Sequence, residues 1–302
     1  MPQINITDID CVYVSGDEPR SQEFWEKLQE YTPRARRVHG VVELDFMTRA
    51  RAGAQCSSTE RFVLIPSDVV PNADFFQAVL DWTSEDLSEV SWHWPCQHNI
   101  NTCMDACYGI SVWNREHVHN LDNQKISDQD VDRVLDLENT PHCVIMHDCV
   151  GTVYANQTAQ QAWRAGFLEG VRLSLYHNRR PTVAEFRDSL PQQQLNTLSI
   201  WHNIGTDTEN GIWAIAGARQ ATYMTVLTAW PWQRANNTKV LQDLWESVQH
   251  SDPRILAGQV GIELHAELRI PVAMFDAEQS RFFKHHLDSR WHNRGLMLRR
   301  HQ

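Results

Sequence analysis

Apolar positions in the first 80 residues follow two different spacings. Short apolar or β-branched runs, which are typical of buried strands, occur at 11–14, 37–42 and 61–65. The segments between them, 21–30 and 46–55, have the spacing or the alanine-rich composition of helices. The order strand, helix, strand, helix, strand predicts a parallel sheet that is covered by helices.

The rest of the chain predicts short strands first and helices later. We expect a helix over 72–80, a long helix over 158–176, and mainly helical structure over 238–302. Further strands are expected at 90–94, 108–113, 144–146 and 198–204, and a helix joined to a strand at 212–224. This pattern predicts one α/β domain over 1–235 and a helical extension over 236–302.

Charge is unevenly distributed along the 302 residues, whose formal net charge is -11. The segment 281–302 holds six lysines and arginines against one aspartate, together with four histidines. One interpretation is a solvated helix whose arginines pair with acidic neighbours. The other is a surface for an anionic partner, either nucleic acid or the acidic face of a second protein subunit.

The absence of an apparent membrane span or signal peptide, together with the cysteine count, predicts where in the cell the protein is found. No apolar run is long enough to span a membrane, and the first ten residues do not read as a signal peptide. Seven cysteines are an odd number, so we expect reduced thiols and a cytosolic protein.

Acidic residues follow two of the expected parallel strands. Asp17 and Glu18 come after the first strand, and Asp68 comes after the third. Ligands of such sheets bind beyond the carboxyl ends of the strands. Carboxylates at that edge can hold a divalent cation against phosphates or accept hydrogen bonds from a ribose. The alternative for Asp68 is a turn or helix-capping residue.

A resemblance to a known family rests on motifs in a fixed order. The segments are Tyr13–Pro19, Arg37–Val41, Arg61–Asp68, Tyr108–Gly109, Ala162–Val171 and Ile200–Gly211. They resemble bacteriophage glycosyltransferases that add a sugar to a hydroxymethylated pyrimidine in hypermodified DNA, and the resemblance covers roughly 8–235. It implies a GT-A-like, Rossmann-type sheet that binds a nucleotide sugar, with helices on both faces and a mainly helical C-terminal segment.

The resemblance also implies a donor site. Asp17 and Glu18 would contact the nucleotide base or ribose of a UDP- or GDP-linked sugar. Asp68 would bind Mn²⁺ or Mg²⁺ together with the diphosphate. His39, Gly40 and Ser67 lie in the same motifs and are expected to line this donor site.

Catalytic and acceptor roles are assigned in the same way. Asp148 is the candidate base that removes a proton from the acceptor, and Asp207 is a second catalytic candidate. Tyr108, Arg164 and Trp201 are expected on the acceptor side. Each acid has a plain alternative, as an ion-pair or turn residue.

The sequence departs from the family pattern at three places along the donor site. Only one acid, Asp68, stands where the family has two, and the residues after Gly40 and Gly109 differ from the usual ones. Two other functions therefore stay open. One is a catalytically silent partner subunit, and the other is a glycosyltransferase that acts on a glycan other than DNA.

The resulting hypothesis is a metal-dependent DNA-base glycosyltransferase in the cytoplasm of an infected bacterium, without a membrane partner. Double-stranded DNA with modified pyrimidines would be its acceptor, and the basic tail 281–302 would contact phosphates or a protein partner. A second group of candidate phosphate contacts is Arg34, Arg36, Arg37, Arg49 and Arg51.

Overall fold

The computed structural model describes residues 3–40, 46–81, 90–123, 143–273 and 275–286. The chain forms two compact units, which we call the sheet unit (Met1–His98 and Met104–Tyr154) and the helical unit (Asn99–Cys103 and Ala155–Gln302). The units separate after Tyr154, whereas the sequence pattern suggested a boundary after residue 235. The reason is that the helices between 159 and 227 pack with the later helices.

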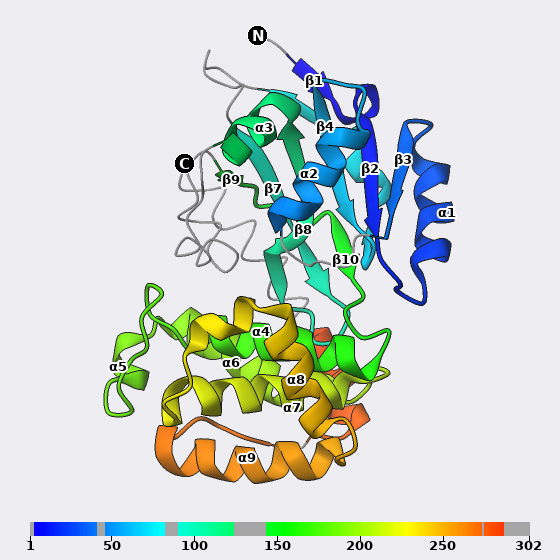
Figure 1. Ribbon diagram of the computed structural model, residues 1–302. Coiled ribbons are helices and arrows are strands. Elements are labelled where there is room, and N and C mark those ends of the chain that lie inside the picture. The colour runs from blue at the N-terminus through cyan, green and yellow to red at the C-terminus, as the bar shows by residue number, and fades with distance from the viewer. Residues whose placement is uncertain (1–2, 41–45, 82–89, 124–142, 274, 287–302) are drawn as a thin grey trace. The chain divides into compact units, whose positions relative to one another are not determined.

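The sheet unit is built on a mixed sheet (Figure 1). Three neighbouring strands, β3 (Ala35–His39), β2 (Asp10–Ser15) and β4 (Arg61–Pro66), are parallel. The sheet continues through β8 (Met104–Asn114), β7 (Ser91–His98), β10 (Gly151–Val153) and β5 (Val69–Pro71), and β9 (Cys143–Ile145) also pairs with β7. The expectation of a parallel sheet is correct for the first three strands and wrong for the β4–β8, β8–β7 and β10–β5 pairs, which are antiparallel.

The chain leaves the parallel pattern immediately after β4. Residues 72–80 do not form the expected helix. A 3-10 turn, Ala73–Gln77, leads into β6 (Val79–Asp81), which pairs with β1 (Gln3–Asn5). The described residues 67–81 hold no crossover helix, and β8 joins β4 in the antiparallel sense.

Two crossover helices cover opposite faces of the parallel strands. Helix α1 (Ser21–Tyr31) links β2 to β3, and α2 (Phe46–Cys56) links β3 to β4. Because β3 and β4 lie on opposite sides of β2, right-handed crossovers place the two helices on opposite faces. The α/β class, with helices on both faces of the sheet and a helical C-terminal part, is therefore confirmed.

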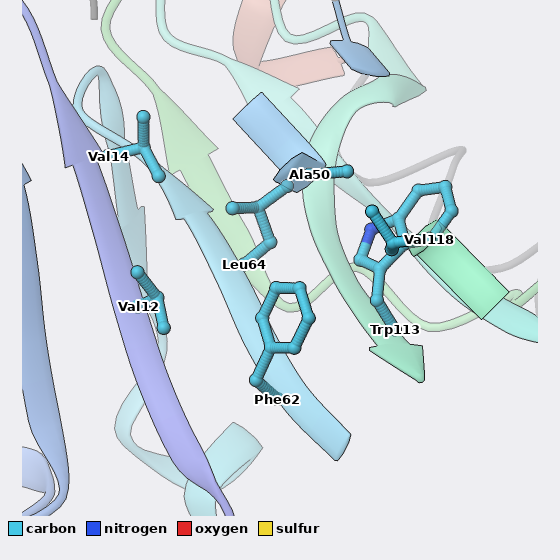
Figure 2. Close-up of a cluster of buried hydrophobic side chains, with 7 residues drawn as sticks. All are labelled: Val12, Val14, Ala50, Phe62, Leu64, Trp113 and Val118. Carbon is cyan, nitrogen blue, oxygen red and sulfur yellow. The ribbon is translucent and has the colours of Figure 1, made fainter. Parts of the chain in front are cut away.

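The α2 face of the sheet buries a compact apolar cluster, shown in Figure 2. Its members come from β2, α2, β4, β8 and α3 (Arg115–Asn123): Val12, Val14, Ala50, Phe62, Leu64, Trp113 and Val118. A Cβ on Gly53 would lie 2.4 Å from the Phe62 ring, so this glycine lets α2 approach β4 closely. Val12 and Val14 face α2, and Tyr13 between them faces α1, where its ring lies 5.9 Å from that of Trp25.

The helical unit is formed by α4 (Ala159–Leu173), α5 (Phe186–Ser189), α6 (Gln192–Asn203), α7 (Gly211–Thr222), α8 (Thr238–Val248) and α9 (Pro253–Leu268). The strand expected at 198–204 is instead the last part of α6, and 212–224 is helical throughout. Among the residues described, no helix has both the length and the apolar character needed to cross a membrane.

A buried carboxylate fixes the amino end of β2. The Asp10 side chain, 2% exposed, accepts hydrogen bonds from Ser58 N (2.6 Å) and Ser58 Oγ (2.9 Å) and pairs with Arg36 Nε (2.7 Å). Burial raises the pKa of Asp10, but the hydrogen bonds from Ser58 and the charge of Arg36 together outweigh it, so the pKa lies below its ordinary value. Arg36, one of the candidate phosphate contacts, therefore already has a carboxylate partner.

We expect Asp10→Asn to lower the free energy of unfolding by about 2–3 kcal/mol at pH 7, because hydrogen bonds to a buried charge are lost. A lowered folded pKa gives stabilisation that is complete above the unfolded value and disappears as the pH falls through the folded value. Urea unfolding at several pH values should therefore show the difference from wild type shrinking below about pH 4. The exposed acid Asp74 supplies the control, Asp74→Asn, and an equal loss in the two variants would contradict this account.

Candidate functional site

The carboxyl ends of β3, β2 and β4 meet at one edge of the sheet. Ser15 pairs in register with His39, and Val14 with Pro66. The chain turns to opposite sides of β2 on its way to β3 and β4, which is the position where open α/β sheets bind ligands. This edge collects all six residues expected to line a donor site, namely Asp17, Glu18, His39, Gly40, Ser67 and Asp68.

A buried tyrosine holds the two acidic turns of this edge in place. The Tyr13 hydroxyl lies 2.9 Å from both Ser21 O and Ser67 O, so it can donate to the turn after β2 or to the turn after β4. Burial raises the pKa of Tyr13, the charges of Glu18 and Asp68 raise it further, and the charge of Arg37 opposes them. The hydroxyl therefore stays a neutral donor, and the two carboxylates lie near enough to act on the same ring.

The acidic side chains themselves differ in exposure. Asp17 is exposed, while Glu18 is half-buried and accepts a hydrogen bond from Gly16 N at 2.8 Å. Asp68 is half-buried, and its backbone carbonyl accepts from Tyr154 N at 2.7 Å. Backbone contacts therefore hold the Glu18 carboxylate and the main chain at Asp68 in place.

Arg37 belongs to this edge, although the sequence suggested only a phosphate contact on a DNA-binding surface. Its guanidinium donates to Ser15 Oγ (3.2 Å) and Gln22 Oε1 (2.6 Å) and lies 5.7 Å and 5.9 Å from the ring centres of Tyr13 and Trp25. The Nδ1 atom of His39 is 3.2 Å from the same Ser15 hydroxyl. The two-residue spacing of Arg37 and His39 in a strand, matching that of Tyr13 and Ser15, is the signal that could have placed Arg37 here.

The edge offers part of a divalent cation site. Among the described residues there is no group of three or more His, Cys, Asp or Glu side chains that could hold a metal ion. Mg²⁺ often binds through one or two carboxylates and completes its coordination with water and substrate phosphates. A single carboxylate, Asp68, could bind a cation that is also coordinated by a diphosphate. It is not sufficient for a cation that is coordinated by protein side chains alone.

The remaining two candidates of the sheet unit lie in other segments. Asp148 is exposed in the connection between β9 and β10, and Tyr108 is part of β8. The side chain of Tyr108 lies outside the described part of the structure. The catalytic role of Asp148 therefore stays a prediction.

Three candidates belong to the helical unit and so to a different compact body from the donor residues. Arg164 is half-buried on α4, and Trp201 on α6 is only 1% exposed, which places its ring among core side chains and not at a ligand surface. Asp207 pairs with Lys284 Nζ at 2.7 Å, and Lys284 also donates to Asn99 O at 3.2 Å. This pairing gives Asp207 a structural role in the helical unit.

Comparisons with known proteins were made for the whole chain. No family model matches it, and no curated protein matches it. Among solved structures, the chain is similar to a glycosyltransferase involved in the glycosylation of the major capsid of PBCV-1. The similarity has a TM-score of 0.30 and 12% identity and covers 48% of this chain and 92% of that chain. A likeness of this size carries no argument about activity, so the functional conclusion rests on the carboxyl edge itself.

Proposed function

We propose that this protein is a glycosyltransferase whose nucleotide-sugar donor binds at the carboxyl edge of β3, β2 and β4. The observation that carries the proposal is the position of Glu18, Asp68 and Arg37 around the end of β2. Carboxylates there can accept hydrogen bonds from ribose hydroxyls, and a guanidinium can bind a diphosphate.

In the proposed reaction, positive charge develops on the sugar and negative charge on the leaving group. Transfer passes through an oxocarbenium-like state, while negative charge develops on the departing nucleoside diphosphate. Asp17 and Glu18 would orient the ribose, and Arg37 would stabilise the charge of the diphosphate. Asp68 would hold Mn²⁺ or Mg²⁺, which supplies further neutralisation of the leaving group when bound.

For the acceptor we propose a hydroxymethylated pyrimidine of double-stranded DNA in the cytoplasm of an infected bacterium. Asp148 would remove the proton of the hydroxymethyl group, with Tyr108 of the same unit on the acceptor side. A base inside a duplex must be flipped out or reached through the major groove, and both routes need positive charge near phosphates. The ordered motifs and the basic segment 281–302 support this acceptor.

The donor site is tested first, by the change in melting temperature with UDP- and GDP-linked sugars, with and without Mn²⁺. We expect one nucleotide to raise the melting temperature in a metal-dependent way. At about 100 times its dissociation constant a ligand adds about 2.7 kcal/mol to stability. A complete lack of response to every donor would favour the catalytically silent partner subunit over the enzyme.

Asp68→Asn is expected to abolish the metal-dependent part of this response and to lower sugar transfer by about 10²-fold or more, because the leaving group loses its neutralising cation. Asp74→Asn, an exposed acid of the same unit, serves as the control and should behave as wild type. Transfer to a different glycan but not to hydroxymethylated DNA would retain the enzyme and change the acceptor. If Asp68→Asn and Asp148→Ala both left transfer unchanged, the proposed mechanism would be wrong.

A further inference from the structure

An open hollow lies on the sheet unit between α2 and α3. The two helices lie side by side in Figure 1. The hollow has a volume of about 330 Å³ and is open to the surface. Helix α2 contributes Arg51 and Gln55, and α3 contributes Arg115, Glu116 and His119. Two arginines and a histidine therefore converge on one hollow of a chain whose net charge is -11.

The walls of this hollow are fixed by ordered contacts. Arg115 Nε donates to Ala54 O at 3.1 Å, which joins the start of α3 to the last turn of α2. Val118 is buried in the apolar cluster beneath. Asn114 Oδ1 accepts from Glu116 N (2.8 Å) and His117 N (3.1 Å), so the amino end of α3 is capped by its own chain.

The charge of Arg115 is directed toward the hollow without a described acidic partner. Within the described part of the chain Arg115 pairs with no carboxylate, in contrast to Arg36, which binds Asp10. Helix α2 contains no acidic residue along its length. Of the described residues that line the hollow, Glu116 is the only acid.

This hollow is separate from the proposed donor site. Helix α2 begins after the carboxyl end of β3 and returns to the amino end of β4, so its last turns lie at the opposite edge of the strands. Arg115 N donates to Glu60 O, one residue before β4, which places the start of α3 at that edge too.

We propose that the hollow between α2 and α3 binds a phosphate group. Guanidinium groups form paired hydrogen bonds with phosphate oxygens, and an open polar hollow allows phosphate to keep part of its hydration. The phosphate can come from a free nucleotide or from the backbone of DNA. The proposal does not depend on glycosyl transfer.

The first arm of the test uses inorganic pyrophosphate with the full chain at low salt and without divalent cations, measured by titration calorimetry. We expect Arg51→Gln and Arg115→Gln each to weaken binding about tenfold, the effect of losing one charge-assisted hydrogen bond. Glu116→Gln should strengthen binding several-fold, because it removes the like charge from the hollow. Arg254→Gln, at an exposed position on α9, should have no effect.

The second arm uses a DNA duplex over a range of salt concentrations. If backbone phosphate is the ligand, Arg51→Gln and Arg115→Gln should each lower the salt dependence of binding by about one unit of slope. An effect on pyrophosphate identifies a free phosphate ligand, and an effect on DNA alone identifies the backbone. If both variants matched Arg254→Gln in both arms, the proposal would be overturned.

Two further variants keep the test independent of folding and of the donor site. Arg115→Lys keeps the charge if Arg115→Gln unfolds, and the opposite effects of Arg51→Gln and Glu116→Gln cannot both arise from destabilisation. Arg37→Gln removes the guanidinium of the proposed donor site. A loss of pyrophosphate binding in Arg37→Gln, but not in Arg51→Gln or Arg115→Gln, would place the ion at the donor site and overturn the proposal for the hollow. Failure of the donor site and failure of this hollow are therefore distinguishable.

Discussion

Arg219→Met should lower the free energy of unfolding of the helical unit by about 3–5 kcal/mol, because the substitution leaves several buried carbonyl groups without donors. The Arg219 side chain is fully buried on α7. Its guanidinium donates to His202 O (2.9 Å), Ala257 O (2.8 Å) and Ala273 O (2.7 Å). One side chain thus joins α7 to α6, to α9 and to the segment after α9.

Burial lowers the pKa of Arg219 to about 10, which leaves the guanidinium charged at neutral pH and able to serve all three carbonyls. The measurement is urea unfolding at pH 7. Arg254→Met, which removes an exposed arginine from α9, is the control and should change stability by less than about 0.5 kcal/mol. A loss below about 1 kcal/mol in Arg219→Met would mean that the carbonyls find other donors.

The second large effect is expected at the contact between α4 and α7. A Cβ on Gly166 would lie 1.9 Å from Ala214 O, and a Cβ on Gly217 would lie 2.0 Å from Trp163 O. Backbone atoms cannot move aside as a flexible side chain does, so the helices must separate. We expect Gly166→Ala or Gly217→Ala to cost about 3 kcal/mol or more, at the upper end of overpacking effects.

The same substitution at Gly258 provides a control in which we expect stability to rise and not to fall. Gly258 lies in α9, and nothing is within 4 Å of an added Cβ. Gly258→Ala should therefore stabilise the helix by about 0.5–1 kcal/mol. Thermal unfolding of the three variants measures both effects, and a similar loss in all three would show that helix propensity and not close packing decides the outcome.

These glycines also bear on the family resemblance. Gly166 and Gly170 belong to the segment Ala162–Val171, one of the motifs that resemble phage glycosyltransferases. In the structure a Cβ on Gly170 would lie 2.4 Å from Ala218 O, so both glycines serve the packing of α4 on α7. A motif of small residues can therefore reflect close helix contact and carry no ligand chemistry.

The edge of the sheet was predictable from the sequence because its signals are local. Apolar runs that alternate with helical segments determine three parallel strands, and such strands have their carboxyl ends at one edge. The turns after β2 and β4 follow directly from those runs. Glu18 and Asp68, 50 positions apart in the chain, could thus be expected at the same edge of the sheet, and the charges of both act on Tyr13.

Two elements were misread because local pattern does not distinguish a buried helix from a strand. Residues 198–204 include Leu198, Trp201 and Ile204, all buried, as they would be in a central strand. Packing within the helical unit makes this segment part of α6. The sequence predicts a helix over 72–80, but the pairing of β6 with β1, near the start of the chain, favours an extended conformation for its last residues.

The sequence by itself determined the βαβαβ start, its exposed and buried faces, and the acidic turns at the carboxyl edge, since all of these follow from neighbours a few residues apart. Tertiary structure alone decided the charge interactions that join distant segments. Asp10 meets Arg36, Asp207 meets Lys284, and Arg219 meets carbonyls of three segments. These partners are far apart in the chain. Because hydrogen bonds and ion pairs act over only a few ångströms, they form only when the packing of whole helices and strands has brought the partners together.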